Sequence, residues 1–220
     1  MTITYHGHSC FKLRGKVGSV VTDPYDSYVG FSLPSLSADM VTVSHQHKDH
    51  NQAQLVSASA RREKPFIIDH LGEYEVGGIS VFGVKSFHDD KKGEERGVNS
   101  IFTIVVDGVR VCHLGDLGHE LDETTLGEIG SVDVLFVPVG GTLSLNAKQA
   151  VAVTRAIDPF FVIPMHYRTA AHNPEIFGEL TPVEEFLKEF GAEGVVPVDK
   201  LKLESDRLPE EMEVVLLEKT

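Results

Sequence analysis

The 220-residue chain contains no tryptophan and only two cysteines, Cys10 and Cys112. Two cysteines without a CxxC pair are too few for a disulfide framework or a thiolate zinc site, so we expect both to be buried as small hydrophobic residues. No apolar run approaches the roughly 20 residues that span a bilayer. The first residues also lack the basic start and apolar stretch of a secretory signal. We therefore expect a cytoplasmic protein without a membrane partner.

Positive charge is scarce as well. The 20 Lys and Arg residues stand against 33 Asp and Glu residues, which gives a formal net charge of −13. Proteins that bind nucleic acid by neutralising phosphates carry a basic face, so we expect no nucleic-acid partner. A hydrophobic content of 41% is ordinary for a globular protein. The length suits a single domain over residues 1–220.

Two kinds of pattern succeed each other along the chain. The first half predicts strands at 2–5, 9–14, 18–22, 40–44, 66–69, 74–76, 79–87, 99–106 and 109–113, an irregular loop at 23–39 and a helix at 51–62. The second half predicts helices at 122–129, 146–157 and 182–190, the last with a capping box at Thr181, and strands at 132–139, 160–164, 194–198 and 212–217. This order predicts two mixed sheets packed face to face with helices outside, a four-layer α/β sandwich.

One segment after the predicted strand 40–44 concentrates potential metal ligands. It holds His45, His47, Asp49 and His50 within six positions. Neutral imidazole and carboxylate suit zinc, with Mn, Fe, Co or Ni as alternatives. In an extended loop His45 and His47 project to one side, and Asp49 and His50 follow across a turn, so two neighbouring ions are favoured over one. The alternative is a solvated polar loop or a helix start with chance histidines, which is a weak explanation for all four residues.

Three later residues stand where predicted strands end. They are His88, Asp116 and His166. Taken singly, each has a structural explanation, as a loop histidine, a helix cap and a buried core histidine. Their common placement at strand ends predicts that they complete the metal site.

These motifs resemble the metallo-β-lactamase superfamily in its single-domain branch. The resemblance is carried by HxHxDH at 45–50, His88, Gly115-Asp116 and Pro-Met-His-Tyr at 164–167, and it extends to 6–10, 22–24 and 137–141. Within that branch the chain is similar to Zn-dependent hydrolases related to the ascorbate-6-phosphate lactonase and, more distantly, to the phospholipase D that cleaves N-acyl phosphatidylethanolamines. The resemblance implies the four-layer αββα metallo-β-lactamase fold. It also implies one ion on His45, His47 and His88, a second on Asp49, His50 and His166, and Asp116 between them.

The resemblance further implies a metal-dependent hydrolase. A water activated by a dinuclear metal centre would attack a small, anionic ester, lactone or phosphodiester, with Asp49 accepting or orienting its proton. The alternative is a non-catalytic module that binds metal or ligand with the same fold. A redox enzyme or a nuclease would need a flavodoxin-like segment or a domain that clamps nucleic acid, and the sequence has neither. Relatives of this kind often self-associate, so a homo-oligomer stays open.

Five residues around the centre receive predicted roles. Asp23 would hold a ligand imidazole from behind, because metal-bound histidines donate their second N–H to such a group, although a turn cap is an equal alternative. His8 would lie near the site, or would only pack. Arg96 and Asn99 would bind an anionic substrate group. His119 could donate a proton or simply flank a helix. No role is predicted for His70, His113 or His172.

Overall fold

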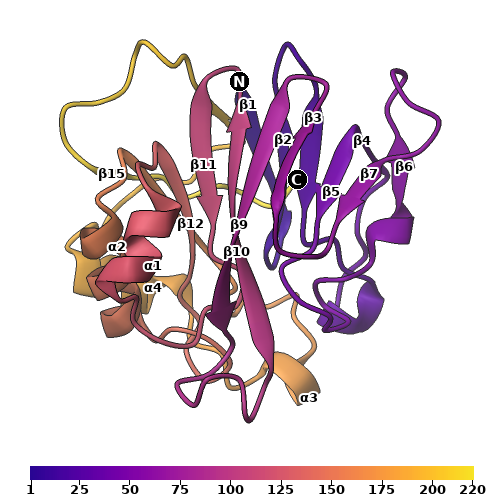
Figure 1. Ribbon diagram of the computed structural model, residues 1–220. Helices are drawn as coiled ribbons and strands as arrows, with labels where there is room; N and C mark the ends of the chain where they lie inside the picture. The colour runs from indigo at the N-terminus through magenta and orange to yellow at the C-terminus, as the bar shows by residue number, and fades with distance from the viewer.

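Two mixed β-sheets packed against each other form the centre of the computed structural model, which describes residues 1–220 (Figure 1). In spatial order, the six-stranded sheet consists of β14 (Leu201–Lys202), β1 (Thr2–Gly7), β2 (Cys10–Arg14), β3 (Ser19–Thr22), β5 (Met40–Thr42) and β7 (Phe66–Ile68). The seven-stranded sheet consists of β15 (Glu213–Val214), β13 (Phe161–Met165), β12 (Val134–Pro138), β11 (Val109–His113), β10 (Val98–Val106), β9 (Ile79–Phe87) and β8 (Glu73–Val76).

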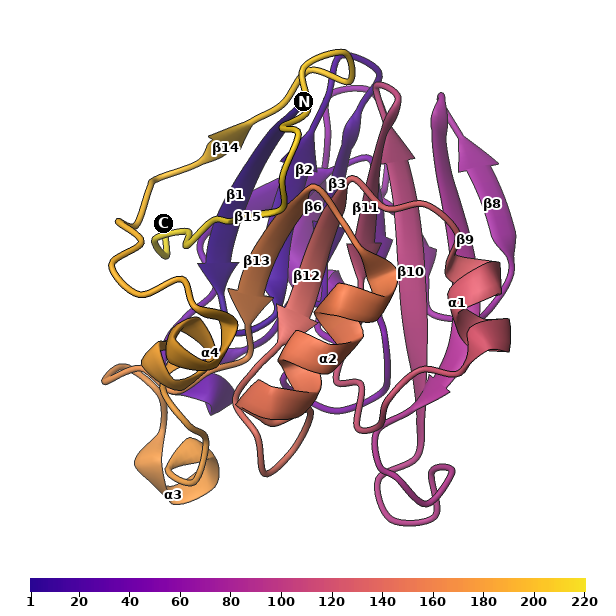
Figure 2. The same ribbon diagram turned by 90° about the vertical axis from the view of Figure 1, so that its left-hand side faces the viewer.

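Different layers cover the outer faces of the two sheets. Helices α1 (Glu123–Ile129), α2 (Ala147–Ile157) and α4 (Val183–Phe190) lie over the seven-stranded sheet (Figure 2). The six-stranded sheet is covered by the 3-10 helices η1 (Ser27–Val29) and η2 (Ala53–Leu55), the small parallel sheet of β4 (Leu36–Ala38) and β6 (Val56–Ala58), and α3 (Pro174–Phe177). The predicted αββα sandwich is therefore confirmed, with short segments forming its fourth layer.

Alternating side chains fill both interfaces of the six-stranded sheet. Neighbouring residues of a strand point to opposite faces. Accordingly, Val20 belongs to the core between the large sheets, and Val21 belongs to the smaller core under β4 and β6. Phe11 on β2 stacks on Phe136 on β12, with ring centroids 3.9 Å apart, and so joins the two sheets directly.

The direction of the strands determines where the site lies. Strands β1, β3 and β5 run the same way, because β2 is antiparallel to both β1 and β3 and β5 is parallel to β3. By the same reasoning β9, β11, β12 and β13 share one direction. Figure 2 shows the arrows of β1, β12 and β13 pointing to the same end of the sandwich. Residues that follow these strands therefore gather at one rim.

The predicted helix at 51–62 is wrong. The segment forms η2 and then β6, whose Val56 and Ala58 pair with Leu36 and Ala38 of β4. Val56 is buried and Ser57 exposed, which is the two-residue period of a strand. The same pairing shows that the predicted irregular loop at 23–39 contains β4 as well as η1.

Two predictions near the C-terminal end of the sequence are also wrong. Thr181 forms no capping box, because Pro182 is the N-cap of α4 and the Thr181 hydroxyl donates instead to the carbonyl of Val139 at 3.4 Å. No strand forms at 194–198, where Val196 is 77% exposed and Val198 makes only an isolated bridge to Leu217. The predicted strand at 212–217 is reduced to β15.

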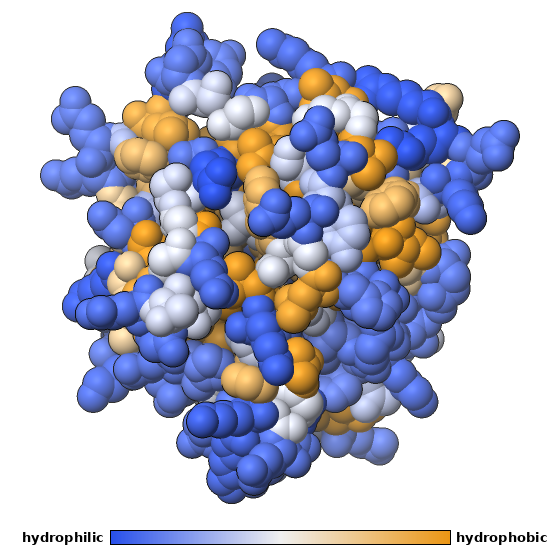
Figure 3. Space-filling view, in the orientation of Figure 1, coloured by the Kyte–Doolittle hydropathy of each residue, from blue (hydrophilic) through white to orange (hydrophobic).

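Both cysteines are fully buried and unpaired, as expected. None of the helices has the length and apolar character that a membrane-spanning helix requires. On the face seen in Figure 3, hydrophobic residues lie in separate patches among polar and charged ones.

Candidate metal centre

The predicted site residues follow strands that end at the same rim. His8 follows β1, Asp23 follows β3, the 45–50 loop follows β5, His88 follows β9, Asp116 comes just after β11, and His166 follows β13. His8, Asp23 and His166 have φ values of 56°, 38° and 53°. Left-handed backbone is uncommon for residues other than glycine and often marks functional sites. Here it turns the chain immediately where each strand ends.

Asp116 lies at the centre of the cluster. Its Oδ2 is 3.2 Å from the Nε2 atoms of His50, His88 and His166 and 3.8 Å from the Nε2 atom of His45. These imidazoles come from both sheets. Asp116 therefore stands where a carboxylate shared by two ions would have to stand.

The remaining candidates form a group on each side. The potential ligand atoms of His45, His47 and His88 lie within 4.8 Å of one another. Those of Asp49, His50 and His166 do so as well, and His8 joins this second group. The structure thus brings together each of the two predicted ligand sets.

Hydrogen bonds from behind determine which ring nitrogen of two histidines faces the centre. Asp23 Oδ2 is 2.8 Å from His50 Nδ1, and since a carboxylate only accepts, Nδ1 carries the hydrogen. The Ser44 hydroxyl donates to Asp23 Oδ2 at 2.5 Å and therefore accepts from His45 Nδ1 at 2.9 Å. In their neutral forms both rings point an Nε2 lone pair toward Asp116. A carboxylate facing two lone pairs is repulsive unless a cation lies between them.

Several atoms at the centre lack partners. His45 Nε2, His50 Nε2, His166 Nε2 and Asp116 Oδ1 are buried without any hydrogen-bond partner. Buried polar atoms are almost always paired, because leaving one unpaired costs about 1–3 kcal/mol. Since the unpaired atoms are imidazole nitrogens and a carboxylate oxygen, they fit a divalent metal of the zinc type.

The electrostatics of the cluster agree with this fit. Burial lowers the pKa of His45 and of His47, so both are unprotonated and able to bind metal at neutral pH. Burial alone would raise the pKa of Asp116, but the imidazoles of His166 and His50 outweigh it and hold the pKa well below its ordinary value. Burial likewise opposes the charge on His50, yet Asp116 and Asp49 raise its pKa well above the usual range. The cluster therefore favours positive charge between its carboxylates, as a proton or as a metal ion.

A pocket of about 440 Å³ opens over this centre. His47, His88 and Asp116 contribute to its wall. Lys48 and Arg96 add positive charge, and an apolar side is formed by Leu143, Ile176 and Phe177. A small molecule with an anionic group and a non-polar part would match this lining.

The loop before Arg96 is folded around one carboxylate. Asp89 accepts hydrogen bonds from the backbone N–H groups of Lys91, Gly93, Glu95 and Arg96 at 2.8–3.1 Å. The Arg96 guanidinium donates to the carbonyl of Thr142 at 2.7 Å. Arg96 is thus held at the pocket wall, as its predicted role requires.

Asn99 is not placed to bind substrate, as the prediction would require. It is fully buried, and its amide donates to Ser86 Oγ at 2.7 Å and to the Leu114 carbonyl at 2.8 Å. Its side-chain oxygen accepts from the N–H of Asp116 at 3.0 Å. Asn99 therefore fixes the backbone that carries Asp116.

His119 is not placed to donate a proton at the centre. Its Nε2 accepts from the backbone N–H of Phe87 at 3.2 Å, and its Nδ1 is 2.7 Å from the carbonyl of Glu120. It also does not line the pocket. The prediction relied on its closeness to Asp116 in sequence, but the His119 ring faces the end of β9.

The residues predicted to lie behind the ligands are in contact with them. Asp23 holds His50, as described above, and His8 Nε2 is 3.1 Å from Asp49 Oδ2. Two contributors were missed. Ser44 fixes His45, and its position directly before the motif was an available signal. His172, 3.3 Å from His8, lies far away in the sequence, and no pattern indicated it.

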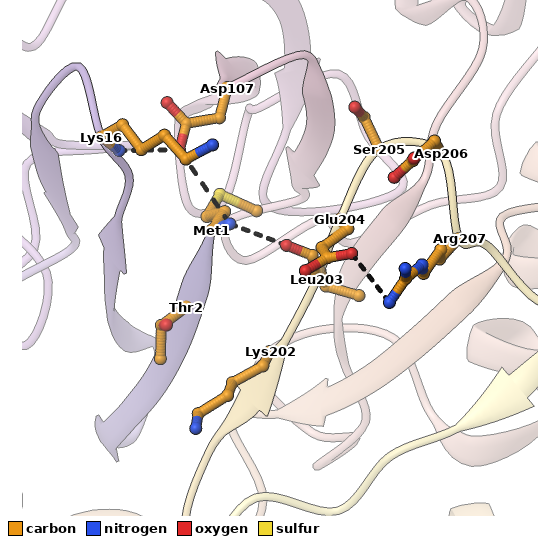
Figure 4. Close-up of a pocket in the computed structure, with 10 residues that line it drawn as sticks. All are labelled: Met1, Thr2, Lys16, Asp107, Lys202, Leu203, Glu204, Ser205, Asp206 and Arg207. Atoms are coloured by element: carbon orange, nitrogen blue, oxygen red, sulfur yellow. Dashed lines mark hydrogen bonds and ion pairs between the residues drawn. The ribbon is translucent and has the colours of Figure 1, made fainter.

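Another pocket, of about 720 Å³ (Figure 4), is larger, but Met1 and Thr2 place it where β1 begins, whereas His8 and the site lie where β1 ends. Several of the charged residues that line it have partners. Asp107 accepts from the backbone of Lys16, Arg207 pairs with Glu204, and the N-terminal ammonium donates to Leu203. Because it has no histidine and none of the buried unpaired ligand atoms, it does not compare with the cluster around Asp116 as a metal site.

Comparison with known proteins agrees with this fold and site. Residues 2–166 match the family model described as the beta-lactamase superfamily domain. The chain is 31% identical over 196 residues to a UPF0173 metal-dependent hydrolase of Archaeoglobus fulgidus, covering 77% of this chain and 84% of the relative. A similar protein of Methanoculleus marisnigri is 32% identical over 191 residues, with coverages of 77% and 82%. A crystal structure from Thermotoga maritima, of a protein ascribed to the metallo-beta-lactamase superfamily, is 38% identical with a TM-score of 0.78 and coverages of 98% and 97%.

The chain therefore belongs to the beta-lactamase superfamily. Within it, the chain is a member of the family of UPF0173 metal-dependent hydrolases. The predicted superfamily, fold and enzyme class are thereby confirmed. The closer relationship to ascorbate-6-phosphate lactonase stays a prediction.

Proposed function

We propose that this hydrolase cleaves a small anionic ester, lactone or phosphodiester at a centre of two divalent ions, zinc first, with Mn, Fe, Co or Ni as alternatives. The observation that carries the proposal is the position of Asp116 Oδ2, within 3.2–3.8 Å of four imidazole nitrogens. Three of those nitrogens, on His45, His50 and His166, are buried and have no hydrogen-bond partner.

The proposed ligands divide by proximity. His45, His47 and His88 would hold one ion, Asp49, His50 and His166 the other, and Asp116 would contact both. When bound, such a pair of ions supplies a water of lowered pKa and polarises the scissile carbonyl or phosphoryl group.

The chain's own residues would position the substrate and move the proton. Asp49 has its carboxylate at the pocket wall and would accept or orient a proton there. Arg96 and Lys48 would hold the anionic group by charge-assisted hydrogen bonds. Leu143, Ile176 and Phe177 would pack against the non-polar part and exclude water from that side.

The alternative is a non-catalytic module that binds metal or ligand. Structural metal sites are closed by protein ligands, whereas catalytic sites keep an open position. Here the pocket reaches His47, His88 and Asp116, which favours the enzyme. Cytoplasmic location, a small-molecule partner and a homo-oligomer stay predictions, and the net charge of −13 supports the proposal that nucleic acid is no partner.

Metal analysis by mass spectrometry, followed by a substrate panel, tests this proposal. We expect two metal ions per wild-type chain and clearly fewer in Asp116→Ala, with hydrolysis of at least one of a set of anionic lactones, phosphodiesters and carboxylic esters. Arg96→Ala should raise KM for that substrate by about tenfold or more, since a charged hydrogen bond contributes about 1.5–3 kcal/mol. Lys92→Ala, an exposed charge change in the same loop, is the matched control. Less than one ion per wild-type chain would refute the centre, and two ions without turnover of any substrate would favour the non-catalytic module.

A further inference from the structure

A line of hydrogen bonds runs from a loop after β13 to Asp49. The backbone N–H and the hydroxyl of Thr169 lie 3.1 Å and 2.9 Å from His172 Nδ1. His172 Nε2 is 3.3 Å from His8 Nδ1. His8 Nε2 is 3.1 Å from Asp49 Oδ2. Four residues from three separate parts of the chain are thereby joined by one continuous line of hydrogen bonds.

The direction of each hydrogen bond follows from the first. A backbone N–H can only donate, so His172 Nδ1 must carry a lone pair and the ring hydrogen sits on Nε2. That hydrogen is donated to His8 Nδ1, which must therefore also carry a lone pair. The hydrogen of the His8 ring then sits on Nε2, where the acceptor is the Asp49 carboxylate. The Asp49 carboxylate can only accept and so requires the same hydrogen on His8 Nε2, which means that both ends of the line specify the same tautomers.

This result decides between two roles for His8. By distance alone His8 could be a ligand, since its nitrogen lies within 4.8 Å of the ligand atoms of Asp49, His50 and His166. A nitrogen that carries a hydrogen has no lone pair for a metal. We propose that His8 is an N–H donor that orients Asp49 and not a metal ligand, and that His172 is a positioning residue that holds the His8 ring through a hydrogen bond to Nδ1.

The surroundings hold this arrangement in place. His8 is fully buried, and its ring packs at 4.2 Å from the His166 ring and 5.0 Å from the Phe177 ring, measured between centroids. His172 is buried as well, and its own backbone N–H donates to the Thr169 carbonyl at 3.2 Å. The ring of His8 therefore has little freedom to turn, and the hydrogen bond from His172 to Nδ1 holds its Nε2–H toward Asp49.

The experiment has one arm that needs no metal. Long-range ¹⁵N–¹H NMR spectra of metal-free protein labelled at histidine report which ring nitrogen carries the hydrogen. We expect the Nε2–H form for His8 and His172 in the wild type. In His172→Phe, which removes the donor but keeps a ring, we expect His8 to keep the Nε2–H form, because the Asp49 carboxylate still accepts from it, and the Nδ1 resonance of His8 to shift, because it loses the N–H from which it accepts. His172→Gln can place an amide N–H near the original Nε2 and should restore the wild-type spectrum of His8.

The second arm rests on the two-ion centre proposed above. Loss of a residue that orients a metal ligand typically lowers metal affinity 10–100-fold. We expect a loss of that size for one of the two ions in His172→Phe, recovery in His172→Gln, and no change in His70→Phe, whose ring is exposed and bonds only to Asp69.

Either of two results would overturn the proposal. One is a wild-type His8 in the Nδ1–H form, or a His8 that loses its Nε2 hydrogen when zinc is added, as a ligand would. The other is unchanged zinc affinity in His172→Phe. If the wild type bound no metal, the two-ion centre would fail, whereas the metal-free spectra would still decide the tautomer of His8. The same wild-type spectra decide it if His172→Phe does not fold.

Discussion

Replacing Asn99 by leucine should destabilise the metal-free protein strongly. Asn99 is close in sequence to the pocket residue Arg96, but its side chain supports the buried backbone. The substitution keeps the size of the side chain but leaves the Leu114 carbonyl and the Asp116 N–H without partners in a fully buried place. Each orphaned group costs about 1–3 kcal/mol, so the free energy of unfolding should fall by roughly 4 kcal/mol. For a chain of this length that corresponds to a Tm lower by about 8–16 °C.

Thermal unfolding followed by circular dichroism in the presence of a chelator measures this change. Val98→Ala is the matched control, because Val98 is the neighbouring residue on β10 and is 50% exposed, so its Tm should move by no more than about 2 °C. Metal binding by Asn99→Leu should also weaken, since Asp116 loses the hydrogen bond that places its backbone. A variant with wild-type Tm and metal affinity but a raised KM would refute the structural role and restore Asn99 as a substrate-binding residue.

Two further predictions concern the core and the response to acid. Phe11→Ala should lower the free energy of unfolding in urea titrations by about 3–5 kcal/mol, because Phe11 stacks on Phe136 between the sheets. Phe66→Ala, at a 40% exposed position, should lower it clearly less. Equal losses in the two variants would contradict the packing described. Burial lowers the pKa of His6 to about 4, so between pH 6.5 and 4 the unfolded chain binds a proton there that the folded chain does not. Stability is therefore lost as pH falls through this window, by up to about 1.4 kcal/mol per pH unit, and in metal-free protein the loss should be smaller by that amount in His6→Gln. Identical pH profiles for the two proteins would show that His6 does not contribute.

The positions of the candidate ligands could be predicted because each stands at a predicted strand end. Four of them lie in one short loop, and the resemblance to a family supplied the grouping of the other three with them. What could not be predicted was the direction in which polar neighbours point. Asn99 and His119 lie close in sequence to His88 and Asp116, but Asn99 pairs with Ser86 across the β9–β10 ladder and faces the interior. His119 turns toward the backbone of Phe87.

The errors in the predicted secondary structure have the same cause, because the structure of these segments depends on residues far away in the chain. Residues 56–58 become a strand because Leu36 to Ala38 lie beside them, and a local pattern with several alanines does not contain that information. His172 is the extreme case, since it contacts His8 across 164 positions of the chain. Local periodicity predicted the strands of the large sheets, where buried alternation is strong, and failed where an element depends on one remote neighbour.

The arrangement of the proposed ligands has a consequence for the mechanics of folding. Each ion would bind residues from the loop after β5 in the six-stranded sheet together with one histidine, His88 or His166, from the seven-stranded sheet. Each would therefore be a cross-link between the two halves of the sandwich. At a thousandfold excess over its Kd, one such ion would add about 4 kcal/mol to stability. Chelation should then separate the sheets first at this rim, so that the edge at which we propose the chemistry takes place would also be the edge at which the protein opens.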